Sequence, residues 1–171
     1  MNGYDALYLS GITLAILPAD IRHELLNFLK TSDALFAFDS NYRPALWGDA
    51  QEARKTINSF WEISDLALPS LDDEMELFQE NFETVQKRFA AYGSLGALKR
   101  GEKGPLSLGE RISATRYPAS PTVVDTTAAG DSFNGAYLGA KLSGENQERA
   151  LQKAHACAAQ VVQVNGAIID A

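Results

Sequence analysis

Residues 34–47 have the sequence ALFAFDSNYRPALW, and this stretch decides the fold class. Its first five residues are all apolar, which is typical of a strand that is buried on both faces of a parallel sheet. Asp39 begins a polar loop, and an amphipathic helical pattern follows over residues 49–62. A buried strand that leads through a polar loop into a helix is half of a βαβ unit, so the stretch predicts an α/β fold.

The alternation of apolar strand and amphipathic helix continues on both sides of this stretch. Strands are predicted at residues 6–11, 34–38, 64–70, 95–101 and 122–127, with antiparallel additions at 104–109 and 111–118. Helices are predicted at residues 18–29, 49–62, 71–79, 81–92, 131–142 and 146–164. The pattern indicates one domain over residues 1–171 with a mostly parallel sheet, and ligands of such sheets bind beyond the carboxyl ends of the strands.

Composition and charge narrow the classes of function. The net charge of −7 provides no overall basic surface for nucleic acid or for an anionic membrane, so neither is expected as a partner. Cys157 is the only cysteine, which excludes an intrachain disulfide and a cysteine-based zinc site and favours a reducing cytoplasm. The first eleven residues, MNGYDALYLSG, contain no basic segment and no long apolar run, so we expect no signal peptide or membrane span.

The loop after the last predicted strand has the pattern of a phosphate site. Residues 125–140 have the sequence DTTAAGDSFNGAYLGA. The small side chains of Ala128, Ala129 and Gly130 leave backbone N–H groups uncovered at a helix N-terminus, which is an anion-binding arrangement. Asp131 follows directly, either as an acidic residue that stabilises the helix dipole or as a base that accepts a proton from an attacking hydroxyl.

Two further loops carry candidate binding residues, and each also has a purely structural interpretation. Arg43 offers a planar set of donors for a carboxylate or phosphate, with Asn41 and Tyr42 beside it, or it simply pairs with a neighbouring acid. Residues 98–104, LKRGEKG, form a nucleotide-side loop or a basic turn. The acidic residues 72–74 organise a magnesium ion through water, or they are a solvated helix start.

Together these motifs resemble the ribokinase-like (phosphofructokinase-B-type) carbohydrate kinases. The stretch 125–140 is similar to the family signature D-T-x-G-A-G-D-x-F-x-x-G, whose conserved positions are occupied by Asp125, Thr126, Gly130, Asp131 and Phe133. Ala128 and the loops LYLSGITLAIL, FDSNYRPALW, SLDDE and LKRGEKG look most like those of 2-keto-3-deoxygluconate kinases. No Walker-type GxxxxGK[ST] loop is present, and no GxGxxG follows the first strand.

The resemblance implies a fold, a reaction and a catalytic centre. The fold is a ribokinase-like three-layer sandwich, and the reaction is ATP-dependent phosphorylation of 2-keto-3-deoxy-D-gluconate to its 6-phosphate. Asp131 corresponds to the catalytic base that deprotonates the sugar hydroxyl, and Ala128, Ala129 and Gly130 correspond to the anion hole for the γ-phosphate. Arg43 corresponds to the residue that binds the carboxylate of the substrate.

The resemblance also implies where ATP and metal ions bind. ATP contacts the anion hole, the substrate–nucleotide junction of Asn41, Tyr42 and Arg43, and a nucleotide loop made of Lys99, Arg100, Gly101, Glu102, Lys103 and Gly104. Glu74 ends the N-x-x-E motif that is linked to Mg²⁺ through water, although Leu71 replaces its asparagine. Residues 164–167, VNGA, resemble a closing loop near the adenine and a monovalent cation.

The chain resembles only the C-terminal part of these enzymes. Family members carry an N-terminal portion with a Gly-Gly substrate motif, several strands and a β-lid, which has no counterpart in this sequence. Three hypotheses follow: a kinase for the sugar acid, a kinase for another sugar such as ribose or fructose, and a non-catalytic remnant. The remnant binds nucleotide or needs a partner that supplies the missing half, and a homo-oligomer is the other expected assembly.

Overall fold

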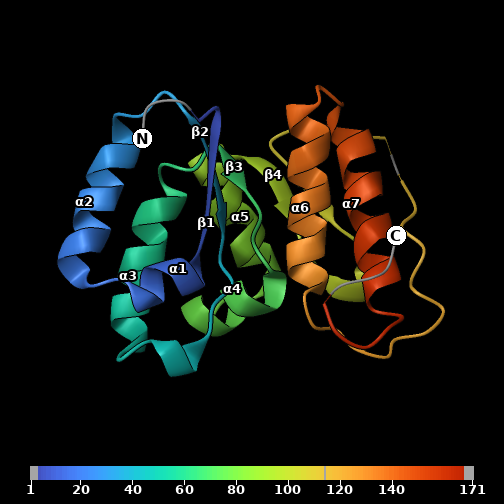
Figure 1. The fold of residues 1–171 in the computed structure, drawn as a ribbon, viewed down its shortest axis with the longest axis horizontal. Helices are drawn as coiled ribbons and strands as arrows, with labels where there is room; N and C mark the ends of the chain where they lie inside the picture. The colour runs from blue at the N-terminus through green and yellow to red at the C-terminus, as the bar shows by residue number, and fades with distance from the viewer. Residues whose placement is uncertain (1–3, 114, 168–171) are drawn as a thin grey trace. The chain divides into compact units, whose positions relative to one another are not determined.

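The computed structural model describes residues 4–113 and 115–167. It divides into two compact units, Met1–Leu98 and Lys99–Ala171, and each unit is described by itself (Figure 1). The division falls directly after the fourth strand, so every helix and strand belongs to one unit. The expectation of a single domain over residues 1–171 remains a prediction.

Four parallel strands form the sheet of the first unit in the order β1-β2-β3-β4. Their bounds are Ala6–Ser10 for β1, Leu35–Asp39 for β2, Leu66–Ala67 for β3 and Leu95–Leu98 for β4. Ser10 pairs in register with Asp39, so β1 and β2 end side by side. This mostly parallel sheet confirms the α/β class that the sequence predicts.

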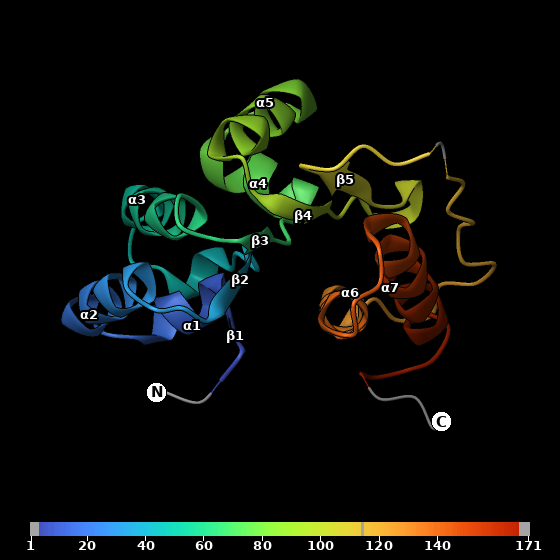
Figure 2. The ribbon, with the colours of Figure 1, turned by 90° about the horizontal axis from the view of Figure 1, so that it is seen from above.

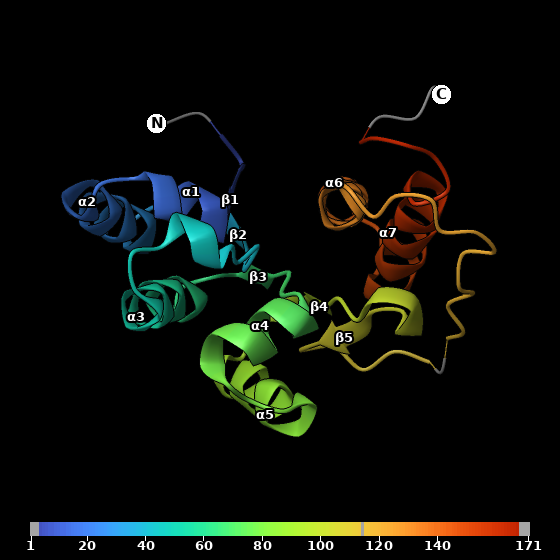
Figure 3. The ribbon, with the colours of Figure 1, turned by 90° about the horizontal axis from the view of Figure 1, so that it is seen from below.

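The helices of the first unit begin at residues that favour helix starts. They are α1 (Gly11–Ile16), α2 (Ala19–Lys30), α3 (Ala50–Trp61), α4 (Leu71–Phe78) and α5 (Phe82–Tyr92), with the short 3₁₀ helix η1 (Pro44–Leu46). Side chains cap two of them: Asp49 accepts a hydrogen bond from the Glu52 amide at 3.1 Å, and Asn81 accepts one from Thr84 at 2.9 Å. Helices α2, α3 and α5 lie along one face of the four strands (Figures 2 and 3).

Aromatic side chains fill the core between β2 and helices α3 and α5. Phe38 is fully buried, and its ring centroid lies 4.6 Å from that of Trp61 and 5.7 Å from that of Phe60. Trp61 in turn contacts Phe89 edge to face at 5.0 Å. Such edge-to-face pairs add to the stability that the buried apolar area provides. Of the apolar run at residues 34–38, Phe36, Ala37 and Phe38 are buried as the sequence predicts, and Ala34 and Leu35 are half-buried.

A buried ion pair connects α4 and α5. Nη2 of Arg88 lies 2.9 Å from Oε2 of Glu74, whose side chain has no exposed surface, and 2.9 Å from Oε2 of Glu80. Burial raises the pKa of Glu74 to about 7 from its ordinary value of 4.5, although Arg88 and the hydroxyl of Ser40 both lower it. Burial therefore favours the protonated form of this carboxyl group, whereas the ion pair with Arg88 favours the charged form.

The second unit is a helical pair with a small strand. It contains η2 (Gly101–Lys103), β5 (Leu106–Leu108), α6 (Ala129–Leu142) and α7 (Gln147–Val161). Helices α6 and α7 lie side by side (Figure 1), and the buried Tyr137 hydroxyl donates a hydrogen bond of 2.7 Å to Oε1 of Gln147. None of the helices within the described residues is long and apolar enough to cross a membrane.

Three local expectations from the sequence are wrong. Residues 122–127 form no strand, because the apolar Val123 and Val124 are 62% and 50% exposed, and the Val124 amide donates to the carbonyl of Val162 at 2.7 Å. Of the expected antiparallel additions, β5 forms only over Leu106–Leu108, and the described residues of 111–118 form no strand. The structure also contains α1, where the sequence suggested only the end of a strand.

Removing the ring at the centre of the aromatic core should destabilise the first unit strongly. We expect Phe38→Ala to lower the free energy of unfolding by about 3–5 kcal/mol, because it leaves a cavity against Phe60 and Trp61. Urea unfolding followed by tryptophan fluorescence measures this, since both tryptophans lie in residues 1–98. Ile16→Ala is the control, because Ile16 is 68% exposed and should change stability by about 0.5 kcal/mol or less. Equal losses in the two variants would contradict the predicted core.

The buried carboxyl group of Glu74 should make stability depend on pH. Its folded pKa of about 7 exceeds its ordinary value of 4.5, so the folded state retains a proton that the unfolded chain has released. The contribution of Glu74 to stability is therefore largest below pH 4.5 and declines as the pH rises to about 7. Relative to Glu74→Gln, the wild-type chain should lose roughly 1–3 kcal/mol across this window, measured by urea unfolding. Parallel pH profiles of the two proteins would show that Glu74 does not titrate there.

Candidate active site

The turn that begins α6 has the geometry of an anion site. Ala128 adopts the left-handed conformation with φ of +59°, and the helix begins at Ala129. The Ser132 amide already donates to the carbonyl of Ala128 at 2.8 Å. The Ala129 amide donates to the carbonyl of Thr126 at 3.2 Å. The amides of Gly130 and Asp131 belong to the first turn, where the helix itself provides no acceptor and where its dipole favours negative charge. The turn predicted from the sequence as an anion hole is thus a left-handed entry into a helix N-terminus.

A lysine lies beside this turn. Nζ of Lys99 donates a hydrogen bond of 3.1 Å to Oδ1 of Asn134, a residue of α6 that is only 2% exposed. A Cβ atom added to Gly130 would lie 3.8 Å from the same Nζ. The ammonium group of Lys99 therefore adds a full positive charge to the partial charge of the helix N-terminus. Asp131, in the first helical turn, has an exposed side chain.

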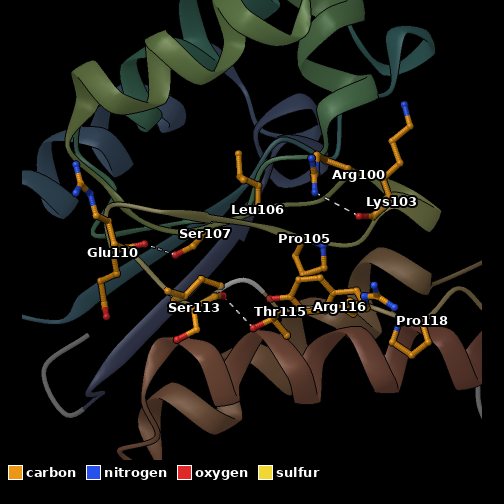
Figure 4. Close-up of a pocket in the computed structure, with 13 residues that line it drawn as sticks. Arg100, Lys103, Pro105, Leu106, Ser107, Glu110, Ser113, Thr115, Arg116 and Pro118 are labelled. Carbon is orange, nitrogen blue, oxygen red and sulfur yellow. Dashed lines mark hydrogen bonds between the residues drawn. The ribbon is translucent and has the colours of Figure 1, made fainter.

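The nucleotide loop predicted at residues 99–104 is a compact turn. Gly101 and Gly104 have φ values of +57° and +72°, and Nε of Arg100 donates to the carbonyl of Gly104 at 3.0 Å. A Cβ atom on Gly104 would lie 2.5 Å from Cβ of Tyr117, so the loop requires glycine at this position. The guanidinium of Arg100 also donates to the carbonyl of Lys103 at 3.3 Å (Figure 4).

A pocket of about 910 Å³ adjoins this loop (Figure 4). Its walls include four basic side chains and one acidic side chain, namely Arg100, Lys103, Arg111, Arg116 and Glu110. Apolar atoms from Pro105, Leu106 and Pro118 complete the walls. A mixed apolar and cationic lining is suited to a ligand that combines a flat apolar group with negative charge.

Asp125 connects the loop before α6 to the loop after α7. Its carboxylate accepts hydrogen bonds from the amides of Thr127 at 2.8 Å and Gly166 at 2.9 Å. Hydrogen bonds from Thr127, together with the one from Gly166, lower the pKa of Asp125. The VNGA segment, residues 164–167, is therefore connected to the start of the signature motif by a hydrogen bond.

In the first unit, the carboxylates of Asp39 and Asp73 accept backbone hydrogen bonds from the loop after β2. The Asn41 amide donates to Oδ1 of Asp39 at 3.2 Å, and Asn41 has a φ of +30°. The Tyr42 amide donates to Oδ2 of Asp73 at 3.0 Å. A Cβ atom on Gly11 would lie 1.9 Å from the Ser40 carbonyl oxygen, so only glycine fits where α1 meets this loop.

Arg43 presents its guanidinium group to the surface from this loop. Its side chain is 53% exposed, and Nη1 donates to the carbonyl of Tyr42 at 2.7 Å. The same nitrogen lies 3.7 Å from Oδ1 of Asp73. One edge of the guanidinium is therefore oriented by the protein, which leaves the remaining donors suited to a planar anion such as a carboxylate.

Glu74 does not have the surroundings of a direct metal ligand. The carboxylate is completely buried, and the guanidinium of Arg88 already neutralises it. Oε1 of Glu74 is buried without a hydrogen-bond partner among the described residues, and no group of three or more His, Cys, Asp or Glu residues in that part of the chain is arranged to hold a metal ion. The link from Glu74 to Mg²⁺ through water remains a prediction.

The structure thus groups the predicted residues in two sets, one in each unit. Asn41, Tyr42 and Arg43 lie with α4 in the first unit, and the loop 99–104 lies with the turn 128–131 in the second. Sequence reasoning missed two residues that orient these sets, namely Arg88 and Asn134, and named Asp73 only as one of the acidic residues 72–74. Asn134 was the easiest to find, because it lies one helical turn beyond Asp131.

The sequence matches a known family and known relatives. Residues 2–171 match the pfkB family carbohydrate kinases. A 2-dehydro-3-deoxygluconokinase of Escherichia coli K12 is 40% identical over 179 residues, which cover 99% of this chain and 58% of the relative. The enzyme of the same description from Dickeya dadantii is 38% identical over 175 residues, which cover 97% and 56%. The chain therefore spans little more than half the length of these curated relatives.

Solved structures show the same fold. A fructokinase from Vibrio cholerae O395, crystallised with fructose, ADP and calcium ion, superimposes with a TM-score of 0.83 at 23% identity, over 98% of this chain and 58% of that protein. A ribokinase II described as putative, from E. coli and in complex with ATP and Mg²⁺, gives a TM-score of 0.76 at 27% identity, over 95% and 54%. The predicted ribokinase-like fold is confirmed, and the chain belongs to the pfkB family of carbohydrate kinases.

Proposed function

We propose that this chain carries the phosphoryl-transfer site of a kinase that converts 2-keto-3-deoxy-D-gluconate and ATP into the 6-phosphate and ADP. The observation that carries the proposal is the turn at the start of α6, where Nζ of Lys99 would lie 3.8 Å from a Cβ atom on Gly130 and donates to Oδ1 of Asn134. The 40% identity to 2-dehydro-3-deoxygluconokinases supports this choice of acceptor. Catalysis of phosphoryl transfer depends mainly on such positioning and charge stabilisation.

In this proposal, residues of the second unit stabilise the transferred charge and accept the proton. The amides of Ala128, Ala129 and Gly130 and the ammonium of Lys99 stabilise negative charge on the γ-phosphoryl group as it is transferred. The carboxylate of Asp131 accepts the proton of the 6-hydroxyl as its oxygen bonds to the γ-phosphorus. The bond from that phosphorus to the bridging oxygen breaks, and ADP leaves with the electron pair.

The first unit supplies recognition of the acceptor. The exposed guanidinium of Arg43 binds the carboxylate of the sugar acid through paired charge-assisted hydrogen bonds. Asn41 and Tyr42 form the junction with the nucleotide in this proposal. A neutral sugar such as ribose or fructose offers no partner for Arg43, which favours an acidic acceptor.

ATP and Mg²⁺ are the proposed cofactors. The structural relatives include proteins crystallised with ATP and Mg²⁺ or with ADP and calcium. Mg²⁺ is usually bound by one or two carboxylates together with phosphate oxygens, so it would enter with the nucleotide. We assign the nucleotide to the loop 99–104, and a monovalent cation to residues 164–167, which Asp125 anchors through Gly166.

A second candidate function is favoured by the edge of the sheet. Among the described strands β1 pairs only with β2, and Tyr8 and Tyr4 are 41% and 67% exposed on it. The chain also spans only 58% of a relative's length. In this alternative, the chain binds nucleotide but transfers phosphate only when a polypeptide equivalent to the N-terminal part of the relatives covers the edge.

Replacing Asp131 tests the proposed base. We expect Asp131→Asn to lower ADP formation from Mg-ATP and 2-keto-3-deoxygluconate by about 10²–10⁴-fold, because an amide cannot accept the proton. Asp20→Asn is the matched control, since Asp20 is also an exposed acid in the first turn of a helix. Wild-type turnover that survives Asp131→Asn would contradict the role of the base. An inactive wild-type chain that gains activity with an added N-terminal polypeptide would support the second candidate.

Replacing Arg43 tests the choice of acceptor. We expect Arg43→Met to lower kcat/KM for the sugar acid by about 10–100-fold, which corresponds to the loss of a hydrogen bond to a charged group. Turnover of ribose and fructose should change little, because neither has a carboxylate. A panel of acceptors measured with both proteins would decide this, and an equal loss for all sugars would contradict the assignment.

A further inference from the structure

We propose that Arg88 is a positioning residue for acceptor binding, which holds Arg43 in place through Glu74 and helix α4. The inference rests on the proposed role of Arg43 in binding the carboxylate of the substrate. Arg88 lies on α5 and touches neither the loop 39–43 nor Arg43 in any contact that the structure records. Its effect on the site therefore has to pass through α4.

The first turn of α4 makes three contacts with the loop 39–43. The Ser70 amide donates to Oγ of Ser40 at 3.1 Å, and the Tyr42 amide donates to Oδ2 of Asp73 at 3.0 Å. Oδ1 of Asp73 lies 3.7 Å from Nη1 of Arg43. Both oxygens of one carboxylate thus contact consecutive residues of the loop. A displacement of α4 must therefore move the backbone at Tyr42 and the guanidinium of Arg43 together.

Two side chains from neighbouring helices fix the position of α4. The helix has only eight residues, and its buried side chains are those of Glu74 and Leu77. It ends at Gln79, which adopts the left-handed conformation with φ of +56°. Near that end, Nε of Arg54 on α3 donates a hydrogen bond to the carbonyl of Leu77. The Glu74–Arg88 pair is the directional contact between the first turn of α4 and a neighbouring helix.

Arg88 is itself held rigidly. Its side chain is 14% exposed, and its guanidinium lies over the ring of Phe78 at 3.9 Å. Nε and Nη2 also contact the carboxylate of Glu80, at 3.0 Å and 2.9 Å. A guanidinium held on one side by Glu80 and on its face by Phe78 presents Nη2 to Glu74 in one orientation.

The adjacent positions of Asp73 and Glu74 explain how the effect is transmitted. Glu74 pairs with Arg88 of α5 and also interacts with the hydroxyl of Ser40, and the neighbouring Asp73 contacts the loop at Tyr42 and Arg43. The two adjacent carboxylates therefore connect the same turn of helix to α5 and to the loop. A displacement of about 1 Å at a binding group can cost about 100-fold in rate, so a rigid support for Arg43 has a functional consequence.

Amide hydrogen exchange of the full chain tests the support without any ligand. We expect Arg88→Met to speed exchange of the Tyr42 and Ser70 amides by about 10-fold or more, because their acceptors move with α4. Arg88→Lys should restore most of the protection, since it keeps a charge opposite Glu74. Glu83→Gln should leave these amides unchanged, because Glu83 is an exposed acidic residue in the first turn of the same helix as Arg88.

A matched destabilised variant separates positioning from general loss of stability. Val85 is completely buried on the same helix as Arg88, and Val85→Ala should lower global stability without a selective effect on the loop. Faster exchange at Tyr42 in Arg88→Met than in Val85→Ala would support the inference. Equal exchange at Tyr42 in the two variants would overturn it.

Binding measurements connect this support to the acceptor. Titration with 2-keto-3-deoxygluconate should show about 10-fold weaker binding to Arg88→Met than to wild type, whereas binding of ADP, which is assigned mainly to the second unit, should weaken much less. An equal loss for both ligands would overturn the inference. A wild-type chain that binds no sugar acid would contradict the proposed function, and the exchange data would still decide whether Arg88 supports the loop.

Discussion

The parallel pairing of β1 with β2 is the constraint on which the loop 39–43, with the proposed acceptor-binding residue Arg43, depends. Because Ser10 lies in register with Asp39, both strands end at the same edge and their loops emerge together. The carbonyl of Ser40 then packs so closely against Gly11 that no side chain is tolerated there. A residue that is glycine only for steric reasons thereby fixes the course of the loop that carries Arg43.

At the proposed phosphate-binding turn before α6, the equivalent constraint is the strained backbone of Ala128. The signature that the sequence resembles has glycine where this chain has Ala128, and Ala128 still adopts a φ of +59°. That conformation costs an alanine about 1–2 kcal/mol, so the surrounding contacts must enforce it. The Asp125 carboxylate contributes to this constraint. It accepts one backbone hydrogen bond from Thr127, before α6, and one from Gly166, after α7. Strain at this turn is consistent with a backbone shaped to present its amides.

Sequence reasoning succeeded where a local pattern determines the structure. An all-apolar run predicts a buried strand, and an acidic or amide residue before an amphipathic run predicts a helix start, so β2, α3 and α5 lie where expected. It failed at residues 122–127, because an apolar run forms a strand only where a neighbouring edge accepts its hydrogen bonds. It could not find Arg88, because the pairing with Glu74 spans fourteen residues and depends on how two helices pack.

The division of the chain after Leu98 separates two kinds of chemistry. Every residue proposed to contact the transferred phosphate or to accept the proton lies in the second unit, and Arg43 with its supports Asp73, Glu74 and Arg88 lies in the first. In this proposal, recognition of the acceptor depends on helices α4 and α5, and their only link to phosphate chemistry is the predicted contact of Glu74 with Mg²⁺ through water. Substitutions along these helices can change which sugar is bound while the turn at Ala128 and the ammonium of Lys99 keep their geometry. Such a separation is expected in a family whose members phosphorylate different sugars on one scaffold.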